Sequence, residues 1–312
     1  LYFLVSLLII IPLNKVTAGQ PEFELNARSA ILMEATTGEV LFSKNTDKKL
    51  PPASMTKIMT MLLVMEAVED DRANLSDKLV VSERAASMGG SQVYLEPGEE
   101  MTLEQMMKAI AISSANDASV AVAEYIYGTE ERFIKKMNER ASELGMENTY
   151  YYNTNGLPTG DKNVEGNYTT AEDLALLTKE ILKYPRVLKW TSTWIDYLRE
   201  GEFVLNNTNK LVRHYKGADG LKTGYTSEAK YCVTSTAKRD DLRFISVIMG
   251  AETSKGRFNE AAQLLSYGFN IYKSKIMAKK GQVIKEIDVW NANNREVKII
   301  ASNKISIPVK KG

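Results

Sequence analysis

The sequence predicts an α+β protein in which helices flank an antiparallel sheet and a helical insertion separates its strands. Three observations carry this prediction: a strand pair near residue 30, a long helical stretch from about residue 100, and further strands beyond residue 230. Of the 312 residues, 44% are hydrophobic and 25% charged, which suits an ordinary globular protein with a sizeable core. Disordered, collagen-like and coiled-coil classes are therefore excluded.

The first eighteen residues are typical of a secretory signal. Leu1 to Leu13 are almost wholly apolar, and Val16 to Ala18 supply small residues at a cleavage site. The sequence starts with Leu1, and no positively charged segment precedes the apolar run, so we expect this start to be incomplete. Residues 1–18 are thus predicted to be a signal peptide of an exported protein, with an uncleaved N-terminal anchor as the alternative.

The first strands and the first helix follow. Residues 30–34 and 40–42 flank a turn at 36–38, which indicates a β-hairpin that the prolines at 51–52 end. Residues 54–69 have apolar residues at helical spacing and on the remaining faces, so this helix should be buried. Its methionines are interpreted as core filling.

The middle and the second half of the chain complete the predicted sheet. The pattern from 100 to 185 is helical, with breaks at glycines and a cap at Thr170. Two extended runs, 231–235 and 244–249, indicate antiparallel strands, and a last helix is expected over about 257–273. The strands of the sheet therefore come from both ends of the chain.

A small β unit is predicted after Gly281. Residues 284–289 and 297–309 resemble short strands. About thirty residues are few for an independent β domain, so we expect this unit to be truncated. The predicted organisation is a main domain over residues 19–280 and the start of a small β domain over 281–312.

Composition excludes several kinds of site. The 40 Lys and Arg nearly balance the 39 Asp and Glu, so no global positive field favours nucleic acid. One Cys and one His exclude intrachain disulfides, cysteine-rich clusters and sites that need several imidazoles. Cys232 lies in a strand-like stretch and is interpreted as core rather than reactive. No G-x-S-x-G elbow accompanies His214, so a serine hydrolase here would use another base.

Ser54 and Lys57 form the first candidate constellation. A spacing of three residues at a helix start brings the hydroxyl and the amine onto one face. Backbone N–H groups and the helix dipole there favour a developing oxyanion, and burial beside a second cation would lower the lysine pKa. The same spacing recurs at Ser227 and Ser235, where turn and strand patterns favour a structural interpretation.

Two further fragments strengthen the constellation. Ser114 and Asn116 lie between helical segments. The other fragment, Lys222-Thr223-Gly224, precedes the strand at 231 and could offer a cation, a hydroxyl and a closely approaching backbone. Taken singly, each also fits a helix break or a solvated loop, and Ser43-Lys44-Asn45 matches the second pattern by chance. The order S-x-x-K, S-x-N, K-T-G, each in suitable local structure, is far more specific.

With these three motifs the sequence resembles the penicillin-binding, serine-type D-alanyl-D-alanine carboxypeptidases, a group within the penicillin-recognising enzymes. The resemblance runs from about residue 30 to about residue 272. It includes further fragments at Gly90-Ser91, 95–99, 116–118, 155–157 and 257–260. It implies the penicillin-recognising fold, shared with serine β-lactamases, followed by a small β domain.

The resemblance implies catalytic roles for three residues. Ser54 would attack the carbonyl between two D-alanines, and Lys57 would take its proton. Ser114 would help to pass the proton to the leaving amine, and Asn116 would orient the substrate amide. The acyl-enzyme on Ser54 would then be hydrolysed by water.

It also implies a substrate-binding wall. Lys222 would lower the pKa of Lys57 and bind the terminal carboxylate with Thr223, while the backbone near Gly224 approaches closely. The N–H groups of Ser54 and Tyr225 would form the oxyanion hole. Arg257 would be a second cation near the carboxylate, acting through Thr223, with a surface arginine at a helix start as the alternative.

The expected substrate is the D-Ala-D-Ala end of peptidoglycan stem pentapeptides, with β-lactams as covalent inhibitors and no metal or other cofactor. Members of the family often carry a membrane-anchoring helix after the small β domain, so peripheral membrane attachment is left open. A serine β-lactamase is a rival interpretation, weakened because no E-x-x-L-N segment is found. A non-catalytic penicillin-recognising sensor and an endopeptidase acting on cross-links are further alternatives.

Overall fold

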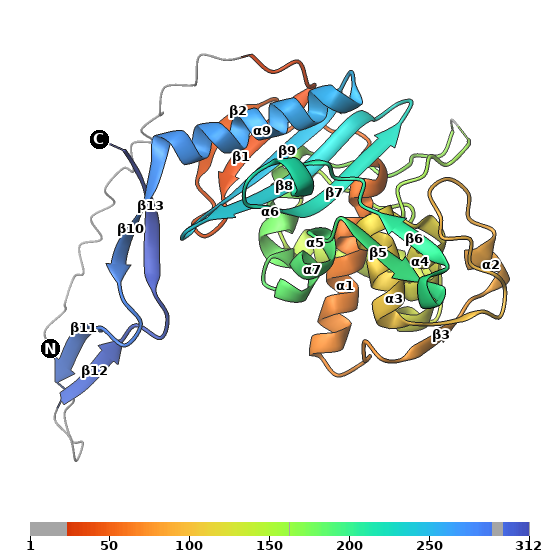
Figure 1. The fold of residues 1–312 in the computed structure, drawn as a ribbon, viewed down its shortest axis with the longest axis horizontal. Coiled ribbons are helices and arrows are strands. Elements are labelled where there is room, and N and C mark those ends of the chain that lie inside the picture. The colour runs from red at the N-terminus through yellow and green to blue at the C-terminus, as the bar shows by residue number, and fades with distance from the viewer. Residues whose placement is uncertain (1–23, 162, 289–295, 312) are drawn as a thin grey trace, which may run out of the picture.

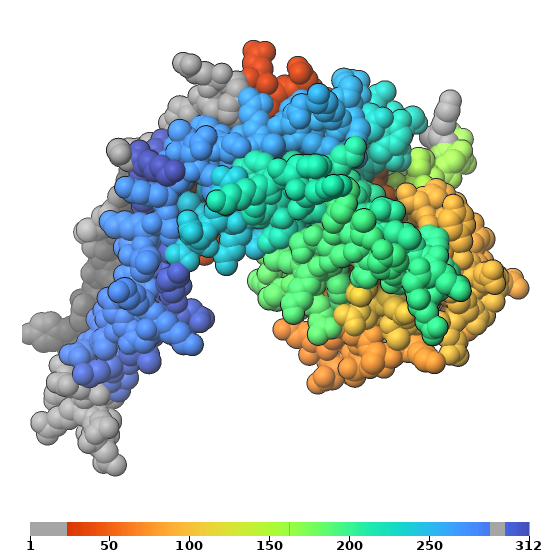
Figure 2. All heavy atoms as spheres, in the orientation of Figure 1, coloured from red at the N-terminus to blue at the C-terminus, as the bar shows by residue number. Residues whose placement is uncertain are grey.

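The structure is a computed structural model that describes residues 24–161, 163–288 and 296–311. The predicted signal peptide over 1–18, and the last residue of the strand predicted at 284–289, lie outside these ranges. A large body carries the main sheet and most of the helices, and a narrow β unit at the C-terminal end projects from it (Figures 1 and 2).

The main sheet has five antiparallel strands in the order β2-β1-β9-β8-β7. The predicted hairpin is confirmed as β1 (Ser29–Glu34) and β2 (Val40–Lys44). The predicted later strands are confirmed as β8 (Lys230–Arg239) and β9 (Leu242–Ala251), and β7 (Ala218–Thr226) completes the sheet. Since β1 pairs with β9, the sheet joins strands from both ends of the chain, as predicted.

Helices cover both faces of this sheet. Helix α9 (Ser254–Ile271) packs on β8 and β9, while α6 (Ala171–Ile181) packs on β1 and β9 from the opposite side (Figure 1). Successive side chains of β1 point to opposite faces of the sheet: Ile31 belongs to the apolar cluster that includes α1, and Leu32 belongs to the cluster beneath α9. Two apolar cores on either side of one sheet thus make up the main body.

The central helix α1 (Lys57–Glu69) follows a short 3₁₀ helix, η1 (Ala53–Thr56). Ten of the thirteen residues of α1 are buried, which confirms the prediction of a buried helix. Its methionines lie within the core, as expected. The remaining elements of the helical region are α2 (Glu83–Ala86), α3 (Leu103–Lys108), the π-helix η2 (Ala109–Ser113), α4 (Asn116–Tyr127), α5 (Glu130–Glu143) and α7 (Pro185–Thr191). Thr170 caps α6 by accepting from the N–H of Asp173, as predicted.

The helical block is less regular than predicted. Residues 144–170 form turns and loops, because side-chain amides bind their backbone groups in place of helical hydrogen bonds. Four short strands, which the sequence pattern did not reveal, pair within or beside this region: β3 (Lys78–Val80), β4 (Glu100–Thr102), β5 (Ile195–Leu198) and β6 (Phe203–Asn206). A short η3 (Arg199–Gly201) joins β5 to β6, and α8 (Leu211–His214) lies between β6 and β7.

The C-terminal unit contains two strand pairs. Strand β10 (Tyr272–Ala278) pairs with β13 (Ile305–Lys310), and β11 (Val283–Asp288) pairs with β12 (Glu296–Ile300). The unit therefore starts one strand before Gly281, because the chain leaves α9 directly into β10. No helix in the described ranges is both long and apolar enough to cross a membrane.

Candidate active site

Ser54 and Lys57 lie where the chain passes from η1 into α1. The Lys57 Nζ atom is 3.0 Å from Ser54 Oγ, because one helical turn separates the two residues. Lys57 is wholly buried and Ser54 is partly exposed. A nucleophile open to solvent thus lies against an amine that is shielded from it.

Two acceptors surround the same amine. Lys57 Nζ donates to Asn116 Oδ1 at 2.6 Å and to the backbone carbonyl of Asn155 at 2.8 Å. Asn116, at the start of α4, donates through Nδ2 to the carbonyl of Gly89 at 2.7 Å, so its oxygen faces the lysine. The sequence did not reveal Asn155 as a site residue, because its contribution is a carbonyl that any residue type supplies; the Asn-Gly turn was the only signal.

Burial sets the charge of this lysine. Desolvation lowers the pKa of Lys57 well below its ordinary value, the nearby Lys222 lowers it further, and Asp117 partly opposes both. Burial beside Arg257 likewise lowers the pKa of Lys222 to about 7. The arrangement therefore favours a neutral Lys57, which is the form that can accept a proton.

Ser114 occupies the reversal between η2 and α4. Its φ of 66° is left-handed, and its side chain is buried at 4% exposure. The N–H of Ser114 donates to the carbonyl of Ala109, which closes the π-helical turn, and the N–H of Ala115 donates to the same carbonyl at 3.1 Å. Ser114 precedes Asn116 by two positions in the sequence. In the described ranges, no hydrogen bond joins the Ser114 hydroxyl to Ser54 or Lys57.

Strand β7 supplies the opposite wall. The Thr223 hydroxyl donates to Thr208 Oγ1 at 2.7 Å, and Lys222 Nζ donates to the carbonyl of Thr223 at 3.2 Å. A Cβ atom on Gly224 would lie 2.7 Å from the carbonyl oxygen of Pro52 and 3.2 Å from the Ser54 nitrogen. Only glycine allows the strand to lie this close to the serine.

Arg257, in the first turn of α9, supports this wall from behind. It is 8% exposed, so the alternative of a surface arginine is wrong. Its Nη1 donates to the carbonyls of Gly224 at 2.9 Å and Cys232 at 3.2 Å, while its buried Nε has no protein partner in the described ranges. The expected route through Thr223 is thus replaced by contact with the Gly224 backbone, and burial lowers the pKa of Arg257 to about 10.

Tyr225 and Cys232 border the same wall. The Tyr225 ring is 54% exposed and lies 4.4 Å from the Tyr231 ring, measured between centroids. Cys232 is fully buried, and desolvation raises the pKa of its thiol to about 11. The interpretation of Cys232 as a core residue is confirmed.

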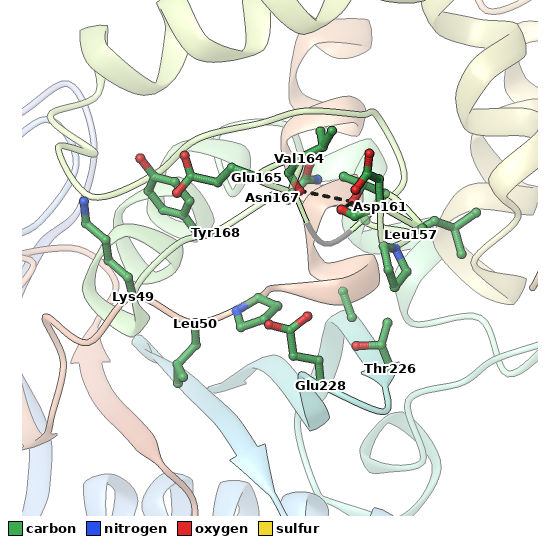
Figure 3. A pocket seen from close by; sticks show the side chains of 17 residues that line it. Lys49, Leu50, Leu157, Asp161, Val164, Glu165, Asn167, Tyr168, Thr226 and Glu228 are labelled. Carbon is green, nitrogen blue, oxygen red and sulfur yellow. Dashed lines mark hydrogen bonds between the residues drawn. The ribbon is translucent and has the colours of Figure 1, made fainter.

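A cavity of about 700 Å³ opens beside the nucleophile (Figure 3). Ala53, the neighbour of Ser54, and Gly156, the neighbour of Asn155, are among its lining residues. In Figure 3, Asp161 and Asn167 lie on one side of it and Thr226 on the other. Ser54, Lys57 and Ser114 do not line this cavity, so it flanks the site rather than containing it. Over the described ranges, no cluster of three His, Cys, Asp or Glu side chains suits a metal ion.

The chain is similar to known proteins over almost its whole length. Residues 14–253 match the family of D-alanyl-D-alanine carboxypeptidases, and residues 272–312 match the C-terminal domain of penicillin-binding protein 5. D-alanyl-D-alanine carboxypeptidase DacF of Bacillus subtilis is 49% identical over 294 residues, or 93% of this chain and 74% of that protein. DacC of Escherichia coli is 35% identical over 92% of this chain and 72% of its own length.

Solved structures agree with these relatives. Penicillin-binding protein 5 of Haemophilus influenzae has a TM-score of 0.82 at 29% identity, over 94% of this chain and 85% of that one. Penicillin-binding protein D2 of Listeria monocytogenes, in its ampicillin-bound form, has a TM-score of 0.72 at 34% identity, over 80% of this chain and 100% of that one. The predicted penicillin-recognising fold is confirmed. By sequence and by fold, the chain belongs to the D-alanyl-D-alanine carboxypeptidase family.

Proposed function

We propose that this protein is a serine-type carboxypeptidase that removes the terminal D-alanine from peptidoglycan stem pentapeptides through an acyl-enzyme on Ser54. The distance of 3.0 Å between Lys57 Nζ and Ser54 Oγ, with Lys57 wholly buried, is the observation that carries this proposal. Such a pair provides a hydroxyl nucleophile and a base whose lowered pKa suits neutral pH.

The acylation step can be written from these residues. Neutral Lys57 takes the Ser54 proton as Oγ bonds to the carbonyl carbon between the two D-alanines. The N–H groups of Ser54 and Tyr225 hold the oxyanion. The C–N bond then breaks, and the proton returns through Ser114 to the amine of the departing D-alanine. Water later hydrolyses the ester and regenerates the Ser54 hydroxyl.

The β7 wall accounts for selectivity toward a free carboxylate. The Thr223 hydroxyl and the Lys222 amine lie on the strand that borders the serine, and Arg257 adds positive charge behind Gly224. An anionic substrate end would raise the pKa of Lys222 from its value of about 7 and so favour its charged form. Asn116 would orient the substrate amide, and no metal is required.

We further propose that the protein is exported and acts at the cell wall or at the outer face of the cytoplasmic membrane. The apolar segment over residues 1–18 and the peptidoglycan-directed activity of the family support this. The main domain is proposed to begin at residue 19 and to end with α9, so that the small β domain starts at β10 rather than after residue 280 as expected from the sequence. β-Lactams are proposed to acylate Ser54, as the ampicillin-bound and cefotaxime-bound forms of the Listeria relative suggest.

A comparison of two serine variants tests the proposal. Ser54→Ala should abolish both D-alanine release from diacetyl-Lys-D-Ala-D-Ala and labelling by a fluorescent penicillin. Ser227→Ala is the matched control, because Ser227 and Lys230 repeat the S-x-x-K spacing in a turn. It should retain both activities.

The two readouts also separate the rival functions. Labelling without D-alanine release would favour a sensor, and fast nitrocefin hydrolysis would favour a β-lactamase. Normal labelling of folded Ser54→Ala would overturn the assignment of the nucleophile.

A further inference from the structure

Two asparagine side chains hold the turn that brings the Asn155 carbonyl to Lys57. Asn153 Oδ1 accepts from the N–H of Gly156 at 2.7 Å, which fixes the far side of the turn. Asn167 Oδ1 accepts from the N–H groups of Tyr152 at 2.7 Å and Asn153 at 3.0 Å, which fixes its near side. The position of the carbonyl therefore depends on side chains outside the three sequence motifs.

Asn167 also binds the segment that carries the nucleophile. Its Nδ2 donates to Thr56 Oγ1 at 2.9 Å, and the Thr56 hydroxyl donates to the carbonyl of Ala53 at 2.9 Å. Thr56 directly precedes Lys57 in the chain. Asn167 is 8% exposed and lies on the loop that borders the cavity (Figure 3). One side chain thus joins the Asn155 turn to the start of α1.

The chemistry of Lys57 explains why this junction matters. A neutral amine has two N–H donors and one lone pair. Asn116 Oδ1 and the Asn155 carbonyl are acceptors only, at 2.6 and 2.8 Å, so together they engage both N–H groups. The lone pair is then left to face Ser54 Oγ at 3.0 Å. Without the Asn155 carbonyl, the amine could rotate and direct an N–H at the serine instead.

We propose that Asn167 is a positioning residue that holds the Asn155 carbonyl against Lys57 and thereby directs the lysine lone pair toward Ser54. The inference rests on the proposed function, because it assumes that Lys57 is the base for Ser54. The proposed role makes the reaction depend on Asn167, which lies more than one hundred residues after Ser54 in the sequence and outside the three catalytic motifs.

The charged groups that act on Lys57 come from two other elements. Lys222 on β7 lowers its pKa and Asp117 on α4 raises it, while burial has the largest effect. Neither charged residue contacts Asn167 in the described ranges. Loss of the Asn167 side chain would let water from the bordering cavity reach the amine and relieve part of its desolvation. The Lys57 pKa should then rise toward its ordinary value, and acylation should require a higher pH.

Asn167→Ala tests the proposal against Asn138→Ala as a matched control. Asn138 also holds this loop, since its Nδ2 donates to the Tyr151 carbonyl at 2.8 Å and its Oδ1 accepts from the Tyr151 N–H at 2.8 Å. In the part of the chain that the structure describes, no hydrogen bond joins Asn138 to the Asn155 turn or to Thr56. Both variants should therefore lose thermal stability, and only Asn167→Ala should impair the base.

The measurement is the rate constant of acylation by a fluorescent penicillin as a function of pH, with the binding constant determined separately. For Asn167→Ala we expect the rate constant at neutral pH to fall on the order of 10- to 100-fold, with its acidic limb displaced to higher pH and binding nearly unchanged. Asn138→Ala should keep the wild-type pH profile. A wild-type rate and pH profile in folded Asn167→Ala would overturn the inference.

Thr56→Val provides a second test if Asn167→Ala does not fold. It removes the Thr56 acceptor but leaves the bonds from Asn167 to Tyr152 and Asn153 in place. It should lower the acylation rate in the same way, and an unchanged rate would count against the proposal. Failure of the proposed function would be recognised separately, because Ser54→Ala would then still be labelled.

Discussion

Helix α1 carries Lys57 and the segment of residues 144–170 binds its amine, yet different forces hold these two parts in place. Helix α1 is buried along most of its length among apolar side chains, and a few hydrogen bonds, such as that from Thr60 to the carbonyl of Thr154 at 2.7 Å, add to this packing. The described residues of the 144–170 segment form no helix or extended strand, and this segment depends on amide side chains such as Asn138, Asn153 and Asn167. The base therefore has its stem in a hydrophobic core and its head in a hydrogen-bonded loop.

This difference predicts different tolerance to change. Apolar packing depends mainly on volume and shape, so volume-conserving substitutions in α1 should cost little. Hydrogen bonds depend on direction, and an unpaired buried group costs the full desolvation penalty, so the loop should tolerate few substitutions at its asparagines and at Gly156. The predictions below test this contrast, starting with the largest expected effect.

Gly156→Ala should be the most damaging substitution in the loop. A Cβ there would lie 1.9 Å from the Ala53 carbonyl oxygen, and its φ of 85° is left-handed. We expect a loss of several kcal/mol of stability, on the order of the largest single-substitution effects, together with loss of penicillin labelling. Chemical denaturation measures the loss of stability, and fluorescent-penicillin labelling measures the loss of the active site. Gly145→Ala is the control, since its φ is 74° but nothing lies within 4 Å, so it should cost only about 1–2 kcal/mol and spare labelling.

In α1, the volume of the substituted side chain should decide how much stability is lost. Met61 is fully buried, so Met61→Ala should lower the free energy of unfolding by about 2–5 kcal/mol, whereas Met61→Leu should cost less than about 1.5 kcal/mol. Denaturant titration of both variants measures this difference. Equal losses in the two variants would contradict the contrast, as would a changed acylation rate in folded Met61→Leu.

The last effect depends on pH and concerns the buried cation of the β7 wall, Lys222. The pKa of Lys222 falls from 10.5 to about 7 on folding, so the unfolded chain binds more protons between these values, and stability should rise with pH across that window. Lys222→Met removes the amine and with it the free-energy cost of burying that group. The variant should be more stable than the wild type by up to a few kcal/mol below pH 7, with the gap closing toward pH 10.5. A pH-independent difference in thermal midpoint would contradict this.

The contrast also explains how much the sequence could predict. The hairpin, the buried helix and strands β8 and β9 follow local periodicity, and the structure contains all of them. The three motifs indicated which residues surround the nucleophile, because their spacing identifies the family. The 144–170 loop could not be predicted, since its bonds join residues distant in sequence and its pattern resembles that of a broken helix.

Two details of the site were also beyond the sequence. The Asn155 carbonyl belongs to the backbone, so residue identity carries no information about it. The partner of Arg257 depends on the packing of α9 on β8 and β9, and this packing directs the guanidinium to the carbonyl of Gly224 rather than to Thr223. Side-chain chemistry is readable from sequence, whereas backbone partners need the folded chain.

The pairing of β1 with β9 has a consequence for the order of folding. Nearby, Glu260 on α9 accepts from the N–H of Ala27, across a separation of 233 residues. Closing so long a loop is slow, and the first hairpin keeps an unpaired edge until β9 is available. The main sheet can therefore close only after the chain has been synthesised as far as β9, which ends at Ala251.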